Sequence, residues 1–317
     1  MLLYLIRRIA YVIPIALAVS LFCFLLVHIA PGDPINAILP PDAPADVVAA
    51  VRTAYGLDKP LPIQFGIWLG HVMTGDLGRS LATGRDIWPD LEGALKNTLI
   101  LAAAASAIGF TLGTVLGALA AVFNGTWIDR SCVGVAVAGV SVPHYWLGMV
   151  MVVIFSVTLN VLPAMGAGPD GTSDWSLDWA HLQFLVLPAV TLSVIPMGII
   201  TRTVRGIVVE ILNQDFVTTL RGKGLRPSGI ILHVLKNAAP NALAVMGLQL
   251  GYLMGGSILV ETVFAWPGTG FLLNTAIFQR DIPVLQATIL VLAMFFVVLN
   301  LGVDLLQTAI DPRMRRS

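Results

Sequence analysis

The residues that could do chemistry in this sequence are few, and their spacing does not assemble a catalytic or metal site. The five histidines are scattered, with no pair four residues apart and no HExxH motif, so no zinc site is legible. Cys23 and Cys132 fall in separate apolar segments, which favours small apolar filler over a disulfide or a metal pair. Ser257 ends a "GGS" that could mimic the nucleophile of an intramembrane protease, but the two last apolar segments offer no His or Lys base.

Nucleotide chemistry is excluded in the same way. The GxxxxGK[ST] loop is absent, because "RGKGLRP" has neither the leading glycine at the required spacing nor a Ser or Thr after Lys223. "PGTG" at Pro267–Gly270 is too short for a phosphate loop. We therefore predict that the chain is not an enzyme and carries no catalytic, cofactor-binding or metal-binding residue.

The composition instead predicts an all-α integral membrane protein. The chain is 57% hydrophobic and 11% charged, with a mean hydropathy of +0.87. Several runs reach the roughly 18 apolar residues that cross a ~30 Å hydrocarbon core. Six transmembrane helices are expected, at about Ile9–Ala30, Thr98–Phe123, Val133–Leu159, Phe184–Thr201, Ala242–Val263 and Val284–Leu306. The first run is longer than the apolar core of a signal peptide and lacks a small-residue cleavage site, so it is interpreted as an anchor.

The Lys and Arg residues predict the orientation, because basic residues concentrate in cytoplasmic segments. Twelve of the 18 basic residues fall at the two chain ends, in the second-to-third connection and in the fourth-to-fifth connection. They are Arg7, Arg8, Arg130, Arg202, Arg205, Arg221, Lys223, Arg226, Lys236, Arg313, Arg315 and Arg316. Both termini are therefore expected on the cytoplasmic side, and residues 31–97 outside.

The expected domains are residues 1–30, the first segment and helix; 31–97, an outer loop; and 98–317, a five-helix core with a cytoplasmic loop at about 202–241. "ADVVAAVRTAYG" predicts a short helix in the outer loop that ends at Gly56, and "IQFGIWLGHVM" predicts an amphipathic one. Two interpretations of this loop stay open. It is either a lid over the helix ends or a docking surface on the outer face.

Two apolar segments carry glycines four residues apart, which lets another backbone approach closely. They are Gly109, Gly113 and Gly117 in the second span, and Gly247, Gly251 and Gly255 in the fifth. The plain interpretation is tight packing within the chain; the sharper one is that the fifth span meets a partner helix across a translocation path. Gln249 and Glu261 favour the sharper one, since polar groups in spans usually face a bundle interior or water. Other ionisable residues are scarce in the spans, so an outside energy source is expected.

The charged stretch "DFVTTLRGKGLRPSG", residues 215–229, interrupts the apolar sequence. We expect Asp215 to cap a short helix, and glycines at positions 222 and 224 to end it. Pro227 stops continuation, and Ser228 is expected to cap the next helix. The short helix has an apolar side, made of Phe216, Val217 and Leu220, and a basic end that suits a groove on a partner protein. The alternative is a solvated loop whose charges only enforce topology.

The stretch resembles the cytoplasmic EAA loop of ABC-importer permeases, whose core is Glu-Ala-Ala, three residues and then Gly. Gly224 matches that glycine, whereas the three positions before the spacer hold Thr218, Thr219 and Leu220. Further segments resemble the dipeptide, oligopeptide and nickel type of permease, in order over nearly the whole chain. They are "HIAPGDP", "YGLDKPLPIQF", "GDLGRS", "VPHYWLG", "GLQLGYLMGGSILVETVFAWPGTGFLL", "RDIPVLQATILVL" and "DPRMR".

The resemblance implies a type I ABC-importer permease in the bacterial inner membrane, forming half of a pathway for peptides or a similar small solute. Its implied partners are a second permease subunit, probably a different chain, two cytoplasmic ATPases that hold ATP and Mg, and an extracytoplasmic solute-binding protein. ATPase coupling would fall to Asp215, Phe216, Thr218, Thr219, Leu220, Arg221, Gly222, Lys223 and Gly224. A permease-like scaffold or regulator and a secondary carrier are the alternatives.

Overall fold

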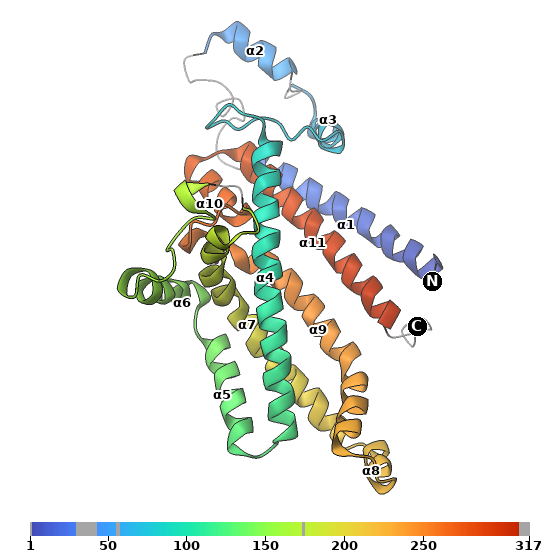
Figure 1. Ribbon diagram of the computed structural model, residues 1–317. Coiled ribbons are helices and arrows are strands. Elements are labelled where there is room, and N and C mark those ends of the chain that lie inside the picture. Colours follow the sequence, from blue (N-terminus) through green and yellow to red (C-terminus); the bar gives the residue numbers. More distant parts are fainter. Residues whose placement is uncertain (1, 30–42, 55–57, 173–174, 311–317) are drawn as a thin grey trace. The chain divides into compact units, whose positions relative to one another are not determined.

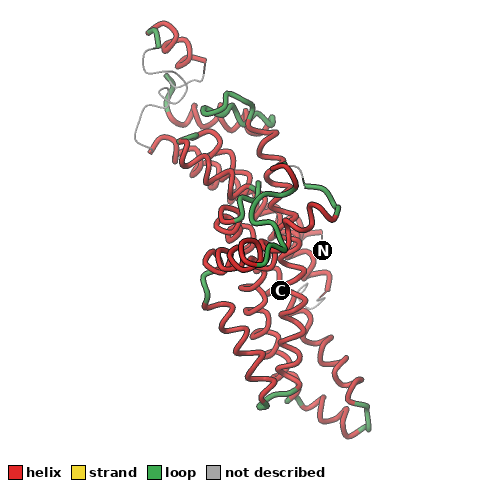
Figure 2. Tube along the Cα trace, turned by 60° about the vertical axis from the view of Figure 1, so that its left-hand side comes forward, coloured by secondary structure: helices red, strands yellow, loops and turns green. Residues whose placement is uncertain are grey.

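The computed structural model describes residues 2–29, 43–54, 58–172 and 175–310. Over these residues the chain forms helices and loops, and the only strand-like pairing is an isolated bridge between Arg79 and Asp86 (Figure 2). Figure 1 labels the main elements. They are α1 (Leu2–Ile29), α2 (Ala45–Ala54), α3 (Leu61–Met73), α4 (Ile87–Val122), α5 (Trp127–Ser141), α6 (His144–Met151), the π-helix Val152–Thr158, the 3-10 turn Pro169–Gly171, α7 (Trp179–Leu212), α8 (Asp215–Gly222), α9 (Pro227–Val263), α10 (Thr269–Gln279) and α11 (Ile282–Ile310).

The helices group into two compact units. The first unit contains Asn97–Pro267, which is most of α4 and all of α5 to α9, together with the end of α11 from Leu299. The second unit contains Leu2–Lys96 and Gly268–Val298, which is α1 to α3, the start of α4, α10 and most of α11.

In the first unit α7 is the central helix, and it packs against α5, α6 and α9. The glycines of α4 lie directly on it. A Cβ atom placed on Gly113 would lie 2.9 Å from the Met197 carbonyl oxygen, and one on Gly117 would lie 2.7 Å from that of Thr201. These distances leave no room for a side chain, so the glycine stripe of the second predicted span serves packing within the chain.

The N-terminus of α7 is fixed by Asp178, which lies on the connection before the helix. Its Oδ1 accepts a hydrogen bond from the His181 backbone N–H at 2.9 Å, as a helix N-cap does. Hydrogen bonds from the Ser176 hydroxyl and from His181 hold the pKa of the Asp178 carboxyl well below its usual value. The carboxylate therefore stays charged at the positive end of the helix dipole.

The predicted single span Val133–Leu159 is wrong, because the chain breaks between α5 and α6. The two helical segments, Trp127–Ser141 and His144–Thr158, meet at an angle of 98°. Val142 has φ −85° and ψ 126°, an extended conformation, and Pro143 follows it. A residue before proline is driven out of the helical region by the proline ring, which explains the break.

Four described helices are long and apolar enough to cross a membrane, and the bent pair makes up to five. They are α4, α7, α9 and the part of α11 up to Val303; α1 adds a shorter apolar stretch, Ala10–Leu25. A sixth span therefore stays a prediction. The helices also extend beyond the predicted spans: α4 begins at Ile87, and α9 runs from Pro227 through Pro240 as one helix.

The second unit has a small core of its own. Ile87 and Leu91 from the start of α4 pack with Ala276 of α10 and with Val284 and Ala287 of α11. The ring of Phe24 in α1 lies 5.5 Å from that of Phe65 and 5.8 Å from that of Trp68, both in α3. The two predicted short helices of the outer loop are present as α2 and α3, and Gly56 lies outside the described residues.

Candidate functional site

The α8 segment ends in a defined turn at Gly224. The Gly224 N–H donates to the Arg221 carbonyl at 2.9 Å, and the Leu225 N–H donates to that of Leu220 at 3.2 Å. This pair of bonds is the Schellman pattern, which requires a left-handed residue. Gly224 has φ +75°, whereas Gly222 is an ordinary helical residue. Gly224 is therefore the residue that reverses the chain before α9.

The start of α8 and the start of α9 differ from the expected caps. Asp215 is the first helical residue and lies in the first turn, and Gln214 holds the N-cap position without a side-chain cap bond. Ser228 lies in the first turn of α9, because Pro227 begins that helix and Arg226 precedes it. Proline at the first helical position needs no N–H partner, which explains why the helix starts there.

The apolar side of α8 is buried in the protein's own core rather than being free for a partner. Val217 is fully buried, and it packs with residues of α7 and α9: Val204, Val208, Ile211, Ile230, Val234 and Ala238. Phe216 and Leu220 are half-buried against the same cluster. The exposed residues of the segment are polar or glycine: Asp215, Thr218, Thr219, Arg221, Gly222, Lys223 and Gly224. A partner would thus meet a polar surface.

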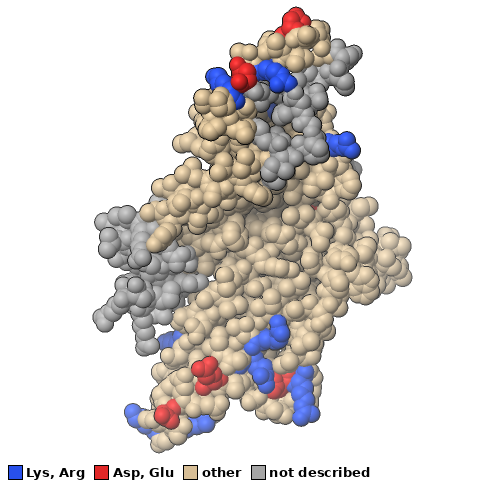
Figure 3. All heavy atoms as spheres, turned by 180° about the vertical axis from the view of Figure 1, so that it is seen from behind, with Lys and Arg blue, Asp and Glu red and all other residues tan. Residues whose placement is uncertain are grey.

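Charged side chains of the first unit gather at the end where α8 and the α4–α5 turn lie, at the bottom of Figure 3. One ion pair there is largely buried. The Arg205 guanidinium of α7 donates to both Asp129 oxygens of α5, at 2.5 and 2.7 Å, and to the Asn124 side-chain oxygen at 3.0 Å. The Gly125 N–H donates to Asp129 at 2.9 Å. The sequence analysis took Arg205 only as a topology signal, and no local motif marks the pair.

The predicted pathway residues of α9 lie in different surroundings. A Cβ on Gly247 would lie 2.1 Å from a Val303 side-chain carbon of α11, so this glycine is a packing contact. Gly251 is buried, whereas a Cβ on Gly255 would have no atom within 4 Å. The Gln249 Oε1 atom is buried and has no hydrogen-bond partner among the described residues. The glycine stripe is therefore free only near Gly255.

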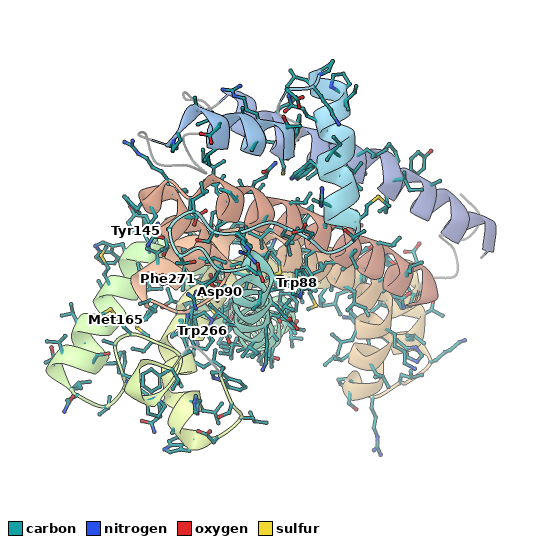
Figure 4. All side chains as sticks on the ribbon, turned by 90° about the horizontal axis from the view of Figure 1, so that it is seen from above. Trp88, Asp90, Tyr145, Met165, Trp266 and Phe271 are labelled. Atoms are coloured by element: carbon teal, nitrogen blue, oxygen red, sulfur yellow. The ribbon has the colours of Figure 1, made fainter. Side chains whose placement is uncertain are left out.

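Glu261, near the end of α9, is fully buried, and the Thr98 hydroxyl of α4 donates to it at 2.8 Å. Trp266, which Figure 4 labels, is also fully buried, and its indole N–H donates to the Asn97 carbonyl at 3.1 Å. The Asn97 side chain in turn donates to the Pro267 carbonyl at 3.0 Å. Together these bonds fasten the end of α9 to α4, which gives Glu261 a structural contact in addition to its predicted pathway role.

Comparison with known proteins identifies the class of molecule. Residues 113–316 match the family described as the binding-protein-dependent transport system inner membrane component, and residues 1–102 match the N-terminal part of the corresponding membrane components. The chain belongs to this family of ABC-importer permeases. It is a permease subunit of the oligopeptide and dipeptide type, as its sequence motifs indicate, and it is a multi-pass protein of the inner membrane.

Curated relatives cover this permease from end to end. It is 39% identical over 316 residues to the glutathione transport system permease protein GsiC of Salmonella choleraesuis (strain SC-B67), with 99% of each chain covered. It is 38% identical over 316 residues to GsiC of Escherichia coli (strain K12), again with 99% of each chain covered. These relatives are named as permeases, not as enzymes, in agreement with the missing nucleotide motif.

A solved structure confirms the fold. The permease resembles a chain of the inward-facing MetNI methionine ABC transporter with a TM-score of 0.55 and 19% sequence identity, over 70% of this chain and 96% of that chain. The likeness shows the type I ABC-importer permease fold.

Proposed function

We propose that this permease forms half of a translocation pathway for glutathione or a short peptide of similar size. Full-length relatives named as glutathione permeases support this solute class. An ABC importer of this family takes its solute from a binding protein, so the expected cargo arrives already selected. A second permease chain would form the other half of the pathway.

The α9 surface offers the place for that second chain. Leu248, Tyr252, Gly255 and Leu259 follow one another at helical spacing, and all four are exposed on the single chain. Residues spaced by three and four positions share one face of a helix. The open space over Gly255 would let a partner backbone approach closely there.

The coupling segment Asp215–Gly229 is proposed to receive the ATPase movement. The observation that carries this proposal is the placement of α8: its apolar side is locked between α7 and α9, and its polar side is exposed. A push on the exposed side would be passed directly to two long helices, because the buried side has no freedom to move separately. Such rigid-body transfer is a common switching mechanism.

The test is transport by the complete complex in lipid vesicles, with its second permease, ATPases and binding protein. We expect ATP-dependent uptake of labelled glutathione that requires the binding protein, and competition by unlabelled glutathione or short peptides. Uptake without ATPases would point to a secondary carrier, and assembly without any uptake would point to a scaffold. Either result would overturn the proposal.

Coupling is tested by reversing the charge on α8. Arg221→Glu combined with Lys223→Glu changes two exposed residues of the proposed ATPase surface. We expect the ATPases to co-purify less well and ATP-driven uptake to fall. The matched control is Lys236→Glu, an exposed basic residue on α9 outside the segment, which should retain uptake. Equal behaviour of the two variants would contradict the role of α8.

A further inference from the structure

Asp281, between α10 and α11 in the second unit, is a buried carboxylate for which the fold alone gives no evident need. Its side chain is 3% exposed. One oxygen accepts from the Ser80 hydroxyl at 2.5 Å and from the Ala82 N–H at 3.2 Å. The other accepts from the Leu81 N–H at 3.2 Å and from the Val284 N–H at 3.4 Å. Three of its four donors therefore come from a loop about 200 residues earlier in the chain.

That loop, Arg79–Asp86, has a fixed shape of its own. The Ser80 N–H donates to the Arg85 carbonyl at 2.9 Å, and the Gly84 N–H donates back to the Ser80 carbonyl at 2.9 Å. The Ser80 hydroxyl, which donates to Asp281, also accepts from the Thr83 N–H at 3.0 Å. Ser80 is buried, whereas residues 82–86 are exposed. The loop thus presents an exposed tip on a buried polar anchor.

The unit's packing does not require this anchor. The apolar contacts between α4, α10 and α11 join those helices without help from the tip of the loop. A buried carboxylate is costly to remove from water unless several donors compensate. Spending such a group on an exposed loop is typical of sites where a scaffold positions residues for recognition.

A cavity of about 200 Å³ lies beside the anchor. Its polar lining includes Thr83, Arg85, Asp90, Thr275 and Gln279, and its apolar lining includes Ile87, Leu272, Ala276 and Val284. Asp90, labelled in Figure 4, pairs with Arg85 at 3.5 Å. The loop therefore borders a recess that a side chain of a partner protein can enter.

We propose that Asp281 is a positioning residue for binding-protein docking: it holds the Arg79–Asp86 loop in the shape that the solute-loaded binding protein recognises. The proposal rests on the proposed function and on the predicted outer location of residues 31–97. In such an importer the outer face meets one protein partner, the binding protein. A pre-shaped loop lowers the entropy lost on docking, and so it acts on affinity rather than on the later steps.

The test is a titration of the complete complex in lipid with loaded binding protein, with ATP hydrolysis as the readout. Asp281→Asn replaces one acceptor oxygen with an NH₂ group that faces backbone or hydroxyl donors. We expect the half-saturating concentration of binding protein to rise about tenfold, as loss of one or two buried hydrogen bonds would produce. The rate at saturating binding protein should stay within about twofold of wild type, because the ATPase contacts are untouched.

Two further variants separate positioning from general stability. Ser80→Ala should raise the half-saturating concentration as well, and Ser80→Thr, which keeps the hydroxyl, should restore it. Thr288→Val removes a buried hydroxyl of α11 that bonds only within its own helix, to the Val284 carbonyl at 2.7 Å, and it should behave like wild type.

The outcomes are distinct. A half-saturating concentration that stays at the wild-type value in both Asp281→Asn and Ser80→Ala overturns the positioning role, even if yield or maximal rate falls. The Ser80 pair decides the question if Asp281→Asn fails to assemble. A wild-type complex that loaded binding protein does not stimulate at all overturns the proposed function, and this proposal with it.

Discussion

The two segments proposed to meet partner proteins are held in place by opposite kinds of contact. The α8 helix is anchored by apolar burial, with Val217 fully enclosed by side chains of α7 and α9. The Arg79–Asp86 loop is anchored by polar bonds that converge on Asp281. Apolar contacts are non-directional, so they allow small sliding, whereas hydrogen bonds weaken steeply when their geometry changes. The comparison teaches that a segment transmitting motion and a segment presenting a fixed shape need different anchors.

The largest effect expected from breaking this contrast is that of Val217→Asp. An unpaired charge would enter a fully buried apolar site, where its desolvation costs several kcal/mol. We expect α8 to leave the cluster, and both ATPase co-purification and ATP-driven uptake to be lost. Ser228→Asp, an exposed position in the first turn of α9, is the control and should retain uptake. Uptake by Val217→Asp would show that the apolar anchor is dispensable.

Arg205→Met asks whether a polar anchor can also matter at the end of the molecule that bears α8. It leaves the Asp129 carboxylate, 6% exposed, without its guanidinium partner. Removing one partner of a buried pair destabilises more than replacing both. We therefore expect the thermal midpoint of the purified complex to fall by several degrees. The double variant Arg205→Met, Asp129→Asn should recover part of that loss, and equal midpoints for the single and double variants would contradict the buried pair.

Val217→Ala should have a graded effect, which sharpens the contrast with the polar anchor. It removes two methyl groups' worth of contact, and the expected loss of stability is about 2 kcal/mol. Since the remaining apolar contacts can adjust, uptake should be reduced but present. Val217→Ile should stay nearer to wild type, because a small apolar enlargement keeps the anchor in place. Complete loss of uptake in Val217→Ala would mean that the α8 anchor is as sensitive to geometry as the polar one.

The smallest effect is expected for Asp86→Asn. Its ion pair with Arg79, at 3.0 Å, joins two side chains that are 69% and 74% exposed. Exposed pairs contribute only about 0–1 kcal/mol. The half-saturating concentration of binding protein should therefore change by less than about threefold, far less than in Asp281→Asn. A larger change would mean that Asp86 itself contacts the partner.

Much of this architecture could be predicted from local sequence signals. Apolar runs located the long helices, and "GKG" located the turn at Gly224, because a left-handed residue at a helix end is usually glycine. The break at Pro143 was missed, although proline after Val142 is the local cause. Long apolar runs on both sides of the proline hid it.

The two polar anchors could not be predicted in the same way. Asp281 and Ser80 are about 200 residues apart, and Asp129 and Arg205 are 76 apart, so only the folded chain brings them together. One signal was available for Asp281, which stands just before a helix with proline at its second position, as N-cap residues do. The burial of Val217 was missed as well. An apolar side on a short helix does not reveal whether the protein or a partner covers it.

The central claim, that α8 transmits the ATPase cycle, is tested most directly at Gly224. Its φ of +75° strains any β-branched residue, and no atom lies within 4 Å of an added Cβ, so Gly224→Val changes the turn without a clash. The measurement is ATP hydrolysis by the purified complex in lipid, with and without loaded binding protein, after all subunits are shown to co-purify. We predict that Gly224→Val assembles but loses stimulation, while Gly222→Ala, at an ordinary helical position with open space, keeps it. Stimulation of Gly224→Val at the wild-type level would contradict the account.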